Sequence, residues 1–172
     1  MNLARQVRNM VARGVVALVN SKTLMQTLQM RLTADEVKDG MEHFEPYGFT
    51  SSPHPGAEGL SLFLSGDRSH GVVICVGDRR FRLTELKPGE VAMYTDEGDR
   101  LVFKRGRVVE LETLTFRVKA QTAVEFETPL IKTTGRIESQ GDQIAAGISQ
   151  INHPHDGVSK GDQQSGKPVV TA

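Results

Sequence analysis

An alternating tract in the C-terminal half most constrains how this 172-residue chain can fold. Between residues 116 and 127, apolar or small side chains occupy every second position, which is the period of a β-strand with two unlike faces. One face carries Phe116, Val118, Ala120, Thr122, Val124 and Phe126, and the other carries Arg117, Lys119, Gln121, Ala123, Glu125 and Glu127. Pro129 ends the alternation, and short segments continue between glycines at 130–134, 135–139 and 144–148.

The apolar face of this tract needs a cover that the rest of the chain does not offer. Each segment is narrow, and a two-stranded ribbon alone is only marginally stable in water. Identical chains that cover one another around a three-fold axis would solve this problem. The tract therefore predicts an intertwined trimeric β-helix or β-prism shaft over residues 106–150, whose folding depends on assembly.

The preceding residues predict an all-β domain, an OB-fold-like barrel over residues 14–105. A short helix is expected over 1–13, because apolar residues recur at helical spacing up to Val11 and Gly14 follows. Residues 34–40 are polar and are not assigned to a strand, whereas a hairpin turn is predicted at 96–99. Short strands separated by turn sequences are expected at 15–19, 24–32, 60–64, 71–76, 81–83, 91–95 and 101–104. This spacing is typical of a small antiparallel barrel.

Composition argues against several classes of function. Lys and Arg together number 21, as do Asp and Glu, so the chain lacks the basic excess of a general nucleic-acid binder. Cys75 is the only cysteine, and its apolar neighbours predict a buried strand residue. The sequence contains no run of about 18 apolar residues that would predict a membrane-spanning helix. The N-terminal arginines resemble a signal peptide only superficially, so we expect a soluble protein made in the cytosol.

His153-Pro154-His155 is a candidate half-site for a metal ion. On an extended segment the two imidazoles point to the same side, because strand side chains alternate. Two ligands do not enclose a metal, but three chains around an axis would supply six imidazole nitrogens. Such a set suits iron or nickel and is less natural for zinc, whose protein sites are usually tetrahedral. The alternative is an exposed polar loop without a metal.

Several segments, and the order in which they occur, resemble the central spike proteins of contractile phage tails, in particular the Mu-type baseplate assembly protein V group. The similar segments lie at 5–13, 47–51, 54–58, 67–71 and 89–92. The alternating tract and the terminal His-x-His motif follow them in the same order as in that family. The order of the parts is more specific than any one motif.

This resemblance implies a virion protein at the tip of the tail baseplate, assembled in the host cytoplasm. It implies a homotrimer in contact with other baseplate and tail-tube proteins, with a collar of OB domains and a β-helical needle. At the tip, over residues 151–172, His153 and His155 of three chains would bind one iron ion octahedrally. The needle would pierce the host outer membrane when the sheath contracts.

Enzymatic function is not expected, because no sequence remains for a catalytic domain and no G-x-S-x-G, P-loop or His-Glu-x-x-His pattern occurs. A different class of function remains open, namely an OB-type module that binds an oligonucleotide or a protein and carries a flexible polar tail. Its binding surface would include the segment 79–82, Arg-Arg-Phe-Arg, although the neutral charge disfavours sequence-specific nucleic-acid binding. His43, His54 and His70 are expected to be surface or turn residues. The acidic clusters at 96–99 and 141–143 are expected to be ordinary turns rather than calcium sites.

Overall fold

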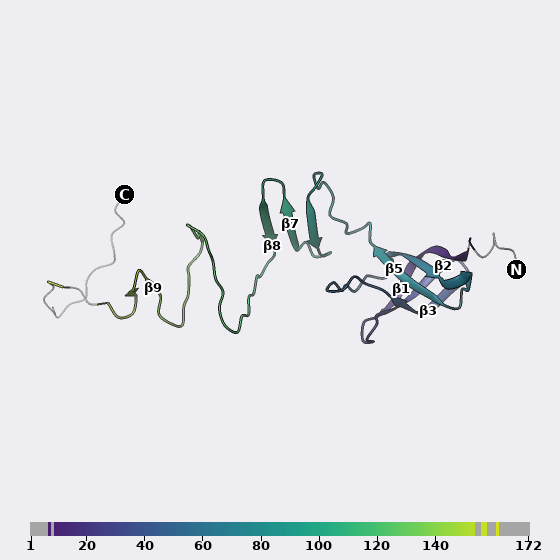
Figure 1. The fold of residues 1–172 in the computed structure, drawn as a ribbon, viewed down its shortest axis with the longest axis horizontal. Coiled ribbons are helices and arrows are strands. Elements are labelled where there is room, and N and C mark those ends of the chain that lie inside the picture. Colours follow the sequence, from purple (N-terminus) through teal and green to yellow (C-terminus); the bar gives the residue numbers. More distant parts are fainter. Residues whose placement is uncertain (1–6, 8, 154–155, 158–160, 162–172) are drawn as a thin grey trace. The chain divides into compact units, whose positions relative to one another are not determined.

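The computed structural model describes residues 7, 9–153, 156–157 and 161 (Figure 1). The chain divides into two compact units, Met1–Val118 and Lys119–Ala172. Within the described residues the secondary structure is almost entirely β, with ten strands and one 3-10 turn at Leu64–Gly66. The predicted all-β class is therefore confirmed.

The first unit contains a closed barrel of five strands (Figure 1). The strands are β1 (Val11–Asn20), β2 (Thr27–Thr33), β3 (Glu36–His43), β4 (Glu58–Phe63) and β5 (Gly71–Gly77). Their order around the barrel is β1-β2-β3-β5-β4, and β4 closes the barrel by pairing with β1. All pairs are antiparallel except β3 and β5. Three consecutive strands followed by a fourth that returns beside the first form a Greek key, the connection found in five-stranded OB barrels.

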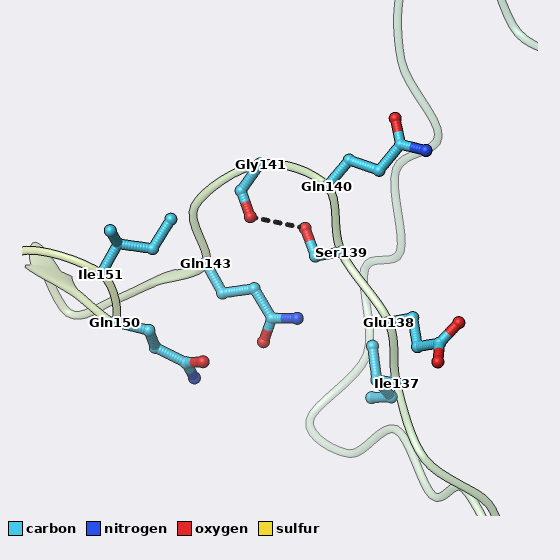
Figure 2. Close-up of a pocket in the computed structure, with 8 residues that line it drawn as sticks. All are labelled: Ile137, Glu138, Ser139, Gln140, Gly141, Gln143, Gln150 and Ile151. Carbon is cyan, nitrogen blue, oxygen red and sulfur yellow. Dashed lines mark hydrogen bonds between the residues drawn. The ribbon is translucent and has the colours of Figure 1, made fainter.

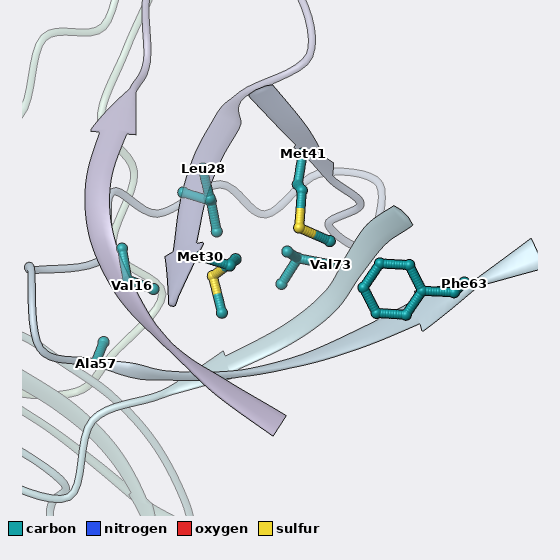
Figure 3. Close-up of a cluster of buried hydrophobic side chains, with 7 residues drawn as sticks. All are labelled: Val16, Leu28, Met30, Met41, Ala57, Phe63 and Val73. Carbon is teal, nitrogen blue, oxygen red and sulfur yellow. The ribbon is translucent and has the colours of Figure 1, made fainter. Parts of the chain in front are cut away.

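The barrel interior is filled by a small set of apolar side chains that point toward one another (Figure 3). Because side chains alternate along a strand, every second residue of β2 and β4 enters this interior. Phe63 is the largest buried side chain among the described residues, and two flexible methionines, Met30 and Met41, are buried in the same cluster. The remaining members of the cluster are Val16, Leu28, Ala57 and Val73.

The start of the barrel differs from the sequence expectation. The first strand begins at Val11, inside the range expected for the N-terminal helix, and helical conformation is described only at Val7 and Asn9. Gly14 does not end a helix but lies buried within β1. A Cβ atom at this position would lie 2.8 Å from the main-chain oxygen of Arg31, so glycine allows β1 to approach β2 closely. Pairing of β1 with two neighbouring strands outweighs the local helical spacing.

The third strand was missed in the sequence because most of its residues are polar. β3 lies on residues not assigned to any strand, and it buries only Met41 and His43 while its other residues face outward or lie at the rim. Conversely, the strand expected at 81–83 is not present, and these residues follow a turn made by Asp78. One of the five barrel strands, β3, is therefore formed by a segment with few apolar residues.

A second, separate sheet follows the barrel. It consists of β6 (Val91–Tyr94), β7 (Arg100–Lys104) and β8 (Val108–Glu112), joined as consecutive antiparallel hairpins. The predicted hairpin turn at 96–99 is confirmed, with Gly98 at a φ of 95°. The expectation that residues 91–104 belong to the barrel is wrong, because the barrel is complete with β1–β5 and closes between β4 and β1. In this sheet only Val102 is buried.

The alternating tract forms no strand in a single chain (Figure 1). Between β8 and Ile144 the described residues have no ladder partner, and a strand exists only when its backbone groups are paired. Two short strands follow, β9 (Ile144–Ala145) and β10 (Ile148–Ser149), which form a hairpin. Its two turn residues, Ala146 and Gly147, both have positive φ, at 50° and 80°, as a type I′ turn requires. None of the helices described is long and apolar enough to cross a membrane.

Candidate functional site

The apolar face of the alternating tract is exposed in the single chain. Phe116 and Phe126 are each 71% exposed, and Val118 and Val124 are each more than half exposed. The exposure continues along the same tract through Leu130, Ile131, Ile137, Ile144, Ile148 and Ile151. Soluble monomers rarely expose a contiguous series of large apolar side chains, and such a series marks an interaction surface. We call residues 113–151, with these side chains, the uncovered tract.

The backbone of the uncovered tract is also without partners over most of its length. Among the described residues, 113–142 take part in no backbone–backbone hydrogen bond. Between residues 113 and 141 the hydrogen bonds are local and span two residues, as from the Thr128 hydroxyl to the Leu130 carbonyl and from the Thr133 hydroxyl to the Gly135 carbonyl. Backbone N–H and C=O groups require partners when they leave water, so covering the apolar face would also require pairing from outside this segment.

An open hollow lies beside the hairpin at the end of the uncovered tract (Figure 2). The chain bends at Gly141, where the Ser139 hydroxyl donates a hydrogen bond to the Gly141 carbonyl. Gln143 and Gln150 line the hairpin side of the hollow, and residues 137–140 line the opposite side. Its mixture of amides and exposed isoleucines contains no catalytic pair or cluster of ligating side chains. The hollow is mostly polar, with Ile137 and Ile151 as its apolar lining residues.

The hairpin is organised by one carboxylate. Oδ1 of Asp142 accepts hydrogen bonds from the backbone N–H groups of Gln150, at 3.1 Å, and Ile151, at 3.2 Å. The pKa of Asp142 is lowered mainly by a hydrogen bond from the Ser149 hydroxyl, and these backbone donors lower it further. Residue 141 is a bend, and Asp142 directly precedes β9 with its carboxylate directed to backbone donors of the hairpin.

His153 lies directly beyond this hairpin and is exposed. Its Nδ1 atom is 2.8 Å from the main-chain oxygen of Ser149. A carbonyl oxygen only accepts, so Nδ1 carries the proton and the lone pair of the neutral ring lies on Nε2. Histidines that bind metals commonly donate their second ring N–H to such a carbonyl, so the surroundings of His153 fit a metal ligand.

The second predicted ligand, His155, lies outside the described residues together with Pro154. In the part of the chain that the structure describes, no group of three or more His, Cys, Asp or Glu side chains could hold a metal ion. The prediction that one chain supplies only part of a metal site therefore remains a prediction.

The other histidines take part in local structure. His54 pairs with Asp96, with 3.1 Å between Nε2 and Oδ2, and His70 lies beside Ser69 in a turn. His43 is buried, with Nδ1 3.3 Å from the Gln26 side-chain oxygen, so its expected place on the surface is wrong. It ends β3 with its side chain on the inward face.

Cys75 is exposed, contrary to the prediction of a buried strand residue. The pairing of β5 with β4 explains this, because Leu60 pairs with Cys75 whereas the next residue, Ser61, pairs with Val73. Ile74 is therefore the extra residue of a β-bulge, which reverses the side of the strand that faces inward. This interruption of the alternation has no marker in the sequence.

Two of the three arginines in the segment 79–82, Arg79 and Arg80, are already paired with carboxylates. Arg79 pairs with Glu58, which also pairs with Arg13, and Arg80 forms a two-pronged pair with Asp78. The Arg80 guanidinium holds the pKa of Asp78 at about 2. Charges already neutralised in this way contribute little to phosphate binding.

A closed barrel followed by a long apolar tract that one chain leaves uncovered is typical of a subunit of a larger assembly. Residues 13–80, which nearly coincide with the barrel, match the family described as "Bacteriophage Mu Gp45, N-terminal". The "Baseplate puncturing device gp45" of Escherichia phage Mu is 38% identical over 151 residues, covering 87% of this chain and 76% of that protein. The "Mu-like prophage FluMu protein gp45" of Haemophilus influenzae is 34% identical, covering 97% of this chain and 94% of that protein.

The chain belongs to the Mu gp45 family of phage baseplate spike proteins. The relationship extends through the uncovered tract as well as the barrel, since the Haemophilus influenzae relative matches nearly the whole chain. The resemblance noted from the sequence is therefore confirmed.

Proposed function

We propose that three copies of this chain form the central spike of a contractile phage tail and pierce the host outer membrane when the sheath contracts. The observation that carries the proposal is the uncovered tract, in which a long series of exposed apolar side chains coincides with an unpaired backbone. Three identical tracts wound together would bury the apolar faces and pair the backbones at the same time. The name of the phage Mu relative, a puncturing device, supports a mechanical role.

In this proposal the barrel faces other baseplate and tail-tube proteins, and the uncovered tract becomes a rigid shaft. A spike must transmit compressive load without bending, and continuous interchain strand pairing provides that stiffness. The task requires no bond-making chemistry, so the protein acts as a structural component of the tail baseplate of the virion and not as an enzyme. Chains would be made and assembled in the host cytoplasm before incorporation into the particle.

At the tip, His153 and His155 from three chains would hold one iron ion. The ion would cross-link three chain ends, and its binding free energy would add to the stability of the assembled shaft. The Nδ1 hydrogen bond of His153 supports this role, because it places the ring lone pair on Nε2.

The proposal is tested by measuring mass and metal content together. Size-exclusion chromatography with light scattering should give about three times the chain mass of 18.9 kDa. Metal analysis should give about one iron per three chains. In the His153→Ala/His155→Ala double variant the iron should be lost while the trimer persists. A monomeric protein whose residues 106–150 are rapidly cleaved by protease would refute the spike and favour the binding module with a flexible tail.

A further inference from the structure

The hairpin β9–β10 is held in a single arrangement by bonds that converge on one side chain. The backbone N–H of Gln150 donates both to Oδ1 of Asp142, at 3.1 Å, and to the main-chain oxygen of Gln143, at 3.0 Å. The next N–H, of Ile151, donates to the same carboxylate oxygen. Asp142 therefore fixes the direction in which the chain leaves the hairpin.

Ser149 extends this arrangement toward His153. Its hydroxyl oxygen accepts the backbone N–H of Asn152 at 2.7 Å, and its main-chain oxygen accepts the Nδ1–H of His153 at 2.8 Å. Ser149 lies opposite Ile144, one position before the hydrogen-bonded pair of Gln150 and Gln143, so its carbonyl points away from the ladder and can accept from His153. The Ser149 hydroxyl in turn donates to Asp142, so a connected set of hydrogen bonds runs from the carboxylate through Ser149 to the imidazole ring.

We propose that Asp142 is a positioning residue for His153, acting through the main chain of Ser149 to fix the tautomer and direction of the imidazole. This inference rests on the proposed function, in which His153 binds a metal at the spike tip. A neutral imidazole exchanges between two tautomers, and only the one protonated on Nδ1 offers Nε2 to a metal. Residues that orient a ligating histidine through its second nitrogen typically change metal affinity by 10–100-fold when they are lost.

The experiment compares three variants of the full-length protein. Asp142→Ala removes the acceptor, whereas Asp142→Asn retains a side-chain oxygen that can accept the same backbone donors. Glu138→Ala is the matched control, because Glu138 is an exposed carboxylate of the same tract that pairs only with Arg136 among the described residues. Each protein is loaded with ferrous iron under anaerobic conditions, and release to a coloured ferrous chelator is followed at constant pH.

We expect Asp142→Ala to accelerate iron release about 10–100-fold and Asp142→Asn to restore release to within about 3-fold of the wild type. Glu138→Ala should behave as the wild type. The second readout is the ¹⁵N spectrum of histidine-labelled, iron-free protein, with the His153 signal assigned by its loss in His153→Ala. That signal should report a protonated Nδ1 in the wild type and a mixture of tautomers in Asp142→Ala.

Two outcomes would overturn the inference. One is equal iron release and equal His153 spectra in Asp142→Ala and Glu138→Ala. The other is a His153 ring protonated on Nε2 in the wild type. If the wild type binds no iron, the proposed metal tip fails, and the spectra alone decide whether Asp142 orients the ring. The two failures are therefore distinguishable.

Discussion

Replacing Phe116 by serine tests whether the apolar face of the uncovered tract is buried by partner chains. Phe116 is 71% exposed in the single chain. A phenylalanine of about 200 Å² would therefore lose about 140 Å² of exposed surface on complete burial. At about 25 cal/mol per Å², this burial contributes about 3.5 kcal/mol per chain and about 10 kcal/mol per trimer, which is an upper estimate. Phe116→Ser should remove most of that stabilisation.

The assay is dissociation of the trimer in guanidinium chloride, followed by light scattering at a fixed protein concentration, because the stability of an oligomer depends on concentration. Arg117→Ser is the matched control, since Arg117 lies on the opposite face of the alternation. We expect Phe116→Ser to dissociate at a clearly lower denaturant concentration than Arg117→Ser. If the two variants dissociate together, within the roughly 0.5 kcal/mol typical of surface changes, Phe116 is not buried by a partner and the reasoning fails.

Three further predictions concern the barrel. Gly14→Ala should destabilise the barrel by about 1–3 kcal/mol in urea unfolding, because the added Cβ would lie 2.8 Å from a main-chain oxygen of β2. The control Gly77→Ala should be nearly neutral, because its added Cβ would have nothing within 4 Å. Equal effects of the two substitutions would contradict the close approach of β1 to β2. Ser61→Ala should leave stability unchanged or raise it by up to about 1 kcal/mol, because this buried hydroxyl has no hydrogen-bond partner among the described residues; a loss of stability would refute this assignment. The Arg68 Nε–H donates a hydrogen bond to Glu36 at 2.8 Å, and this bond lowers the pKa of Glu36 below 4.5. The pair therefore stabilises the fold fully above pH 4.5, and this stabilisation is lost as the pH falls through the lowered pKa of Glu36. The difference in Tm between wild type and Glu36→Gln should therefore be largest near neutral pH and shrink in acid, and a difference independent of pH would contradict this origin.

The sequence predicted the β class and the hairpin around residues 96–99 correctly because their signals are local. Hydrophobic alternation and turn residues such as those at 96–99 can be read from a few consecutive positions, and the structure confirms this turn. Errors arose where distant residues decide the outcome. Gly14 belongs to a strand because β1 pairs with β2 and β4, and Cys75 faces outward because a bulge at Ile74 reverses β5. β3 is polar along most of its length, so its place in the barrel depends on pairing rather than on its own composition.

The candidate site divides in the same way. The sequence alone singled out His153 and His155 as candidate metal ligands, because imidazoles two residues apart are a local pattern, and this assignment stays a prediction. No pattern in the sequence indicates that Asp142, eleven residues before His153, organises the hairpin β9–β10. That connection depends on backbone N–H and C=O groups, which are present in almost every residue type and therefore leave no mark in the side-chain pattern.

The sequence by itself determined that this protein carries an apolar tract too long to be covered by its own remaining residues, and that it belongs with phage spike proteins. Only the tertiary structure decided which segments close the barrel, that β6–β8 form a separate sheet, and which nitrogen of His153 carries the proton. The physical reason is the range of the interactions. Hydrophobic periodicity is a property of consecutive residues, whereas strand pairing, bulges and the tautomer of a histidine depend on groups that folding brings together from distant positions.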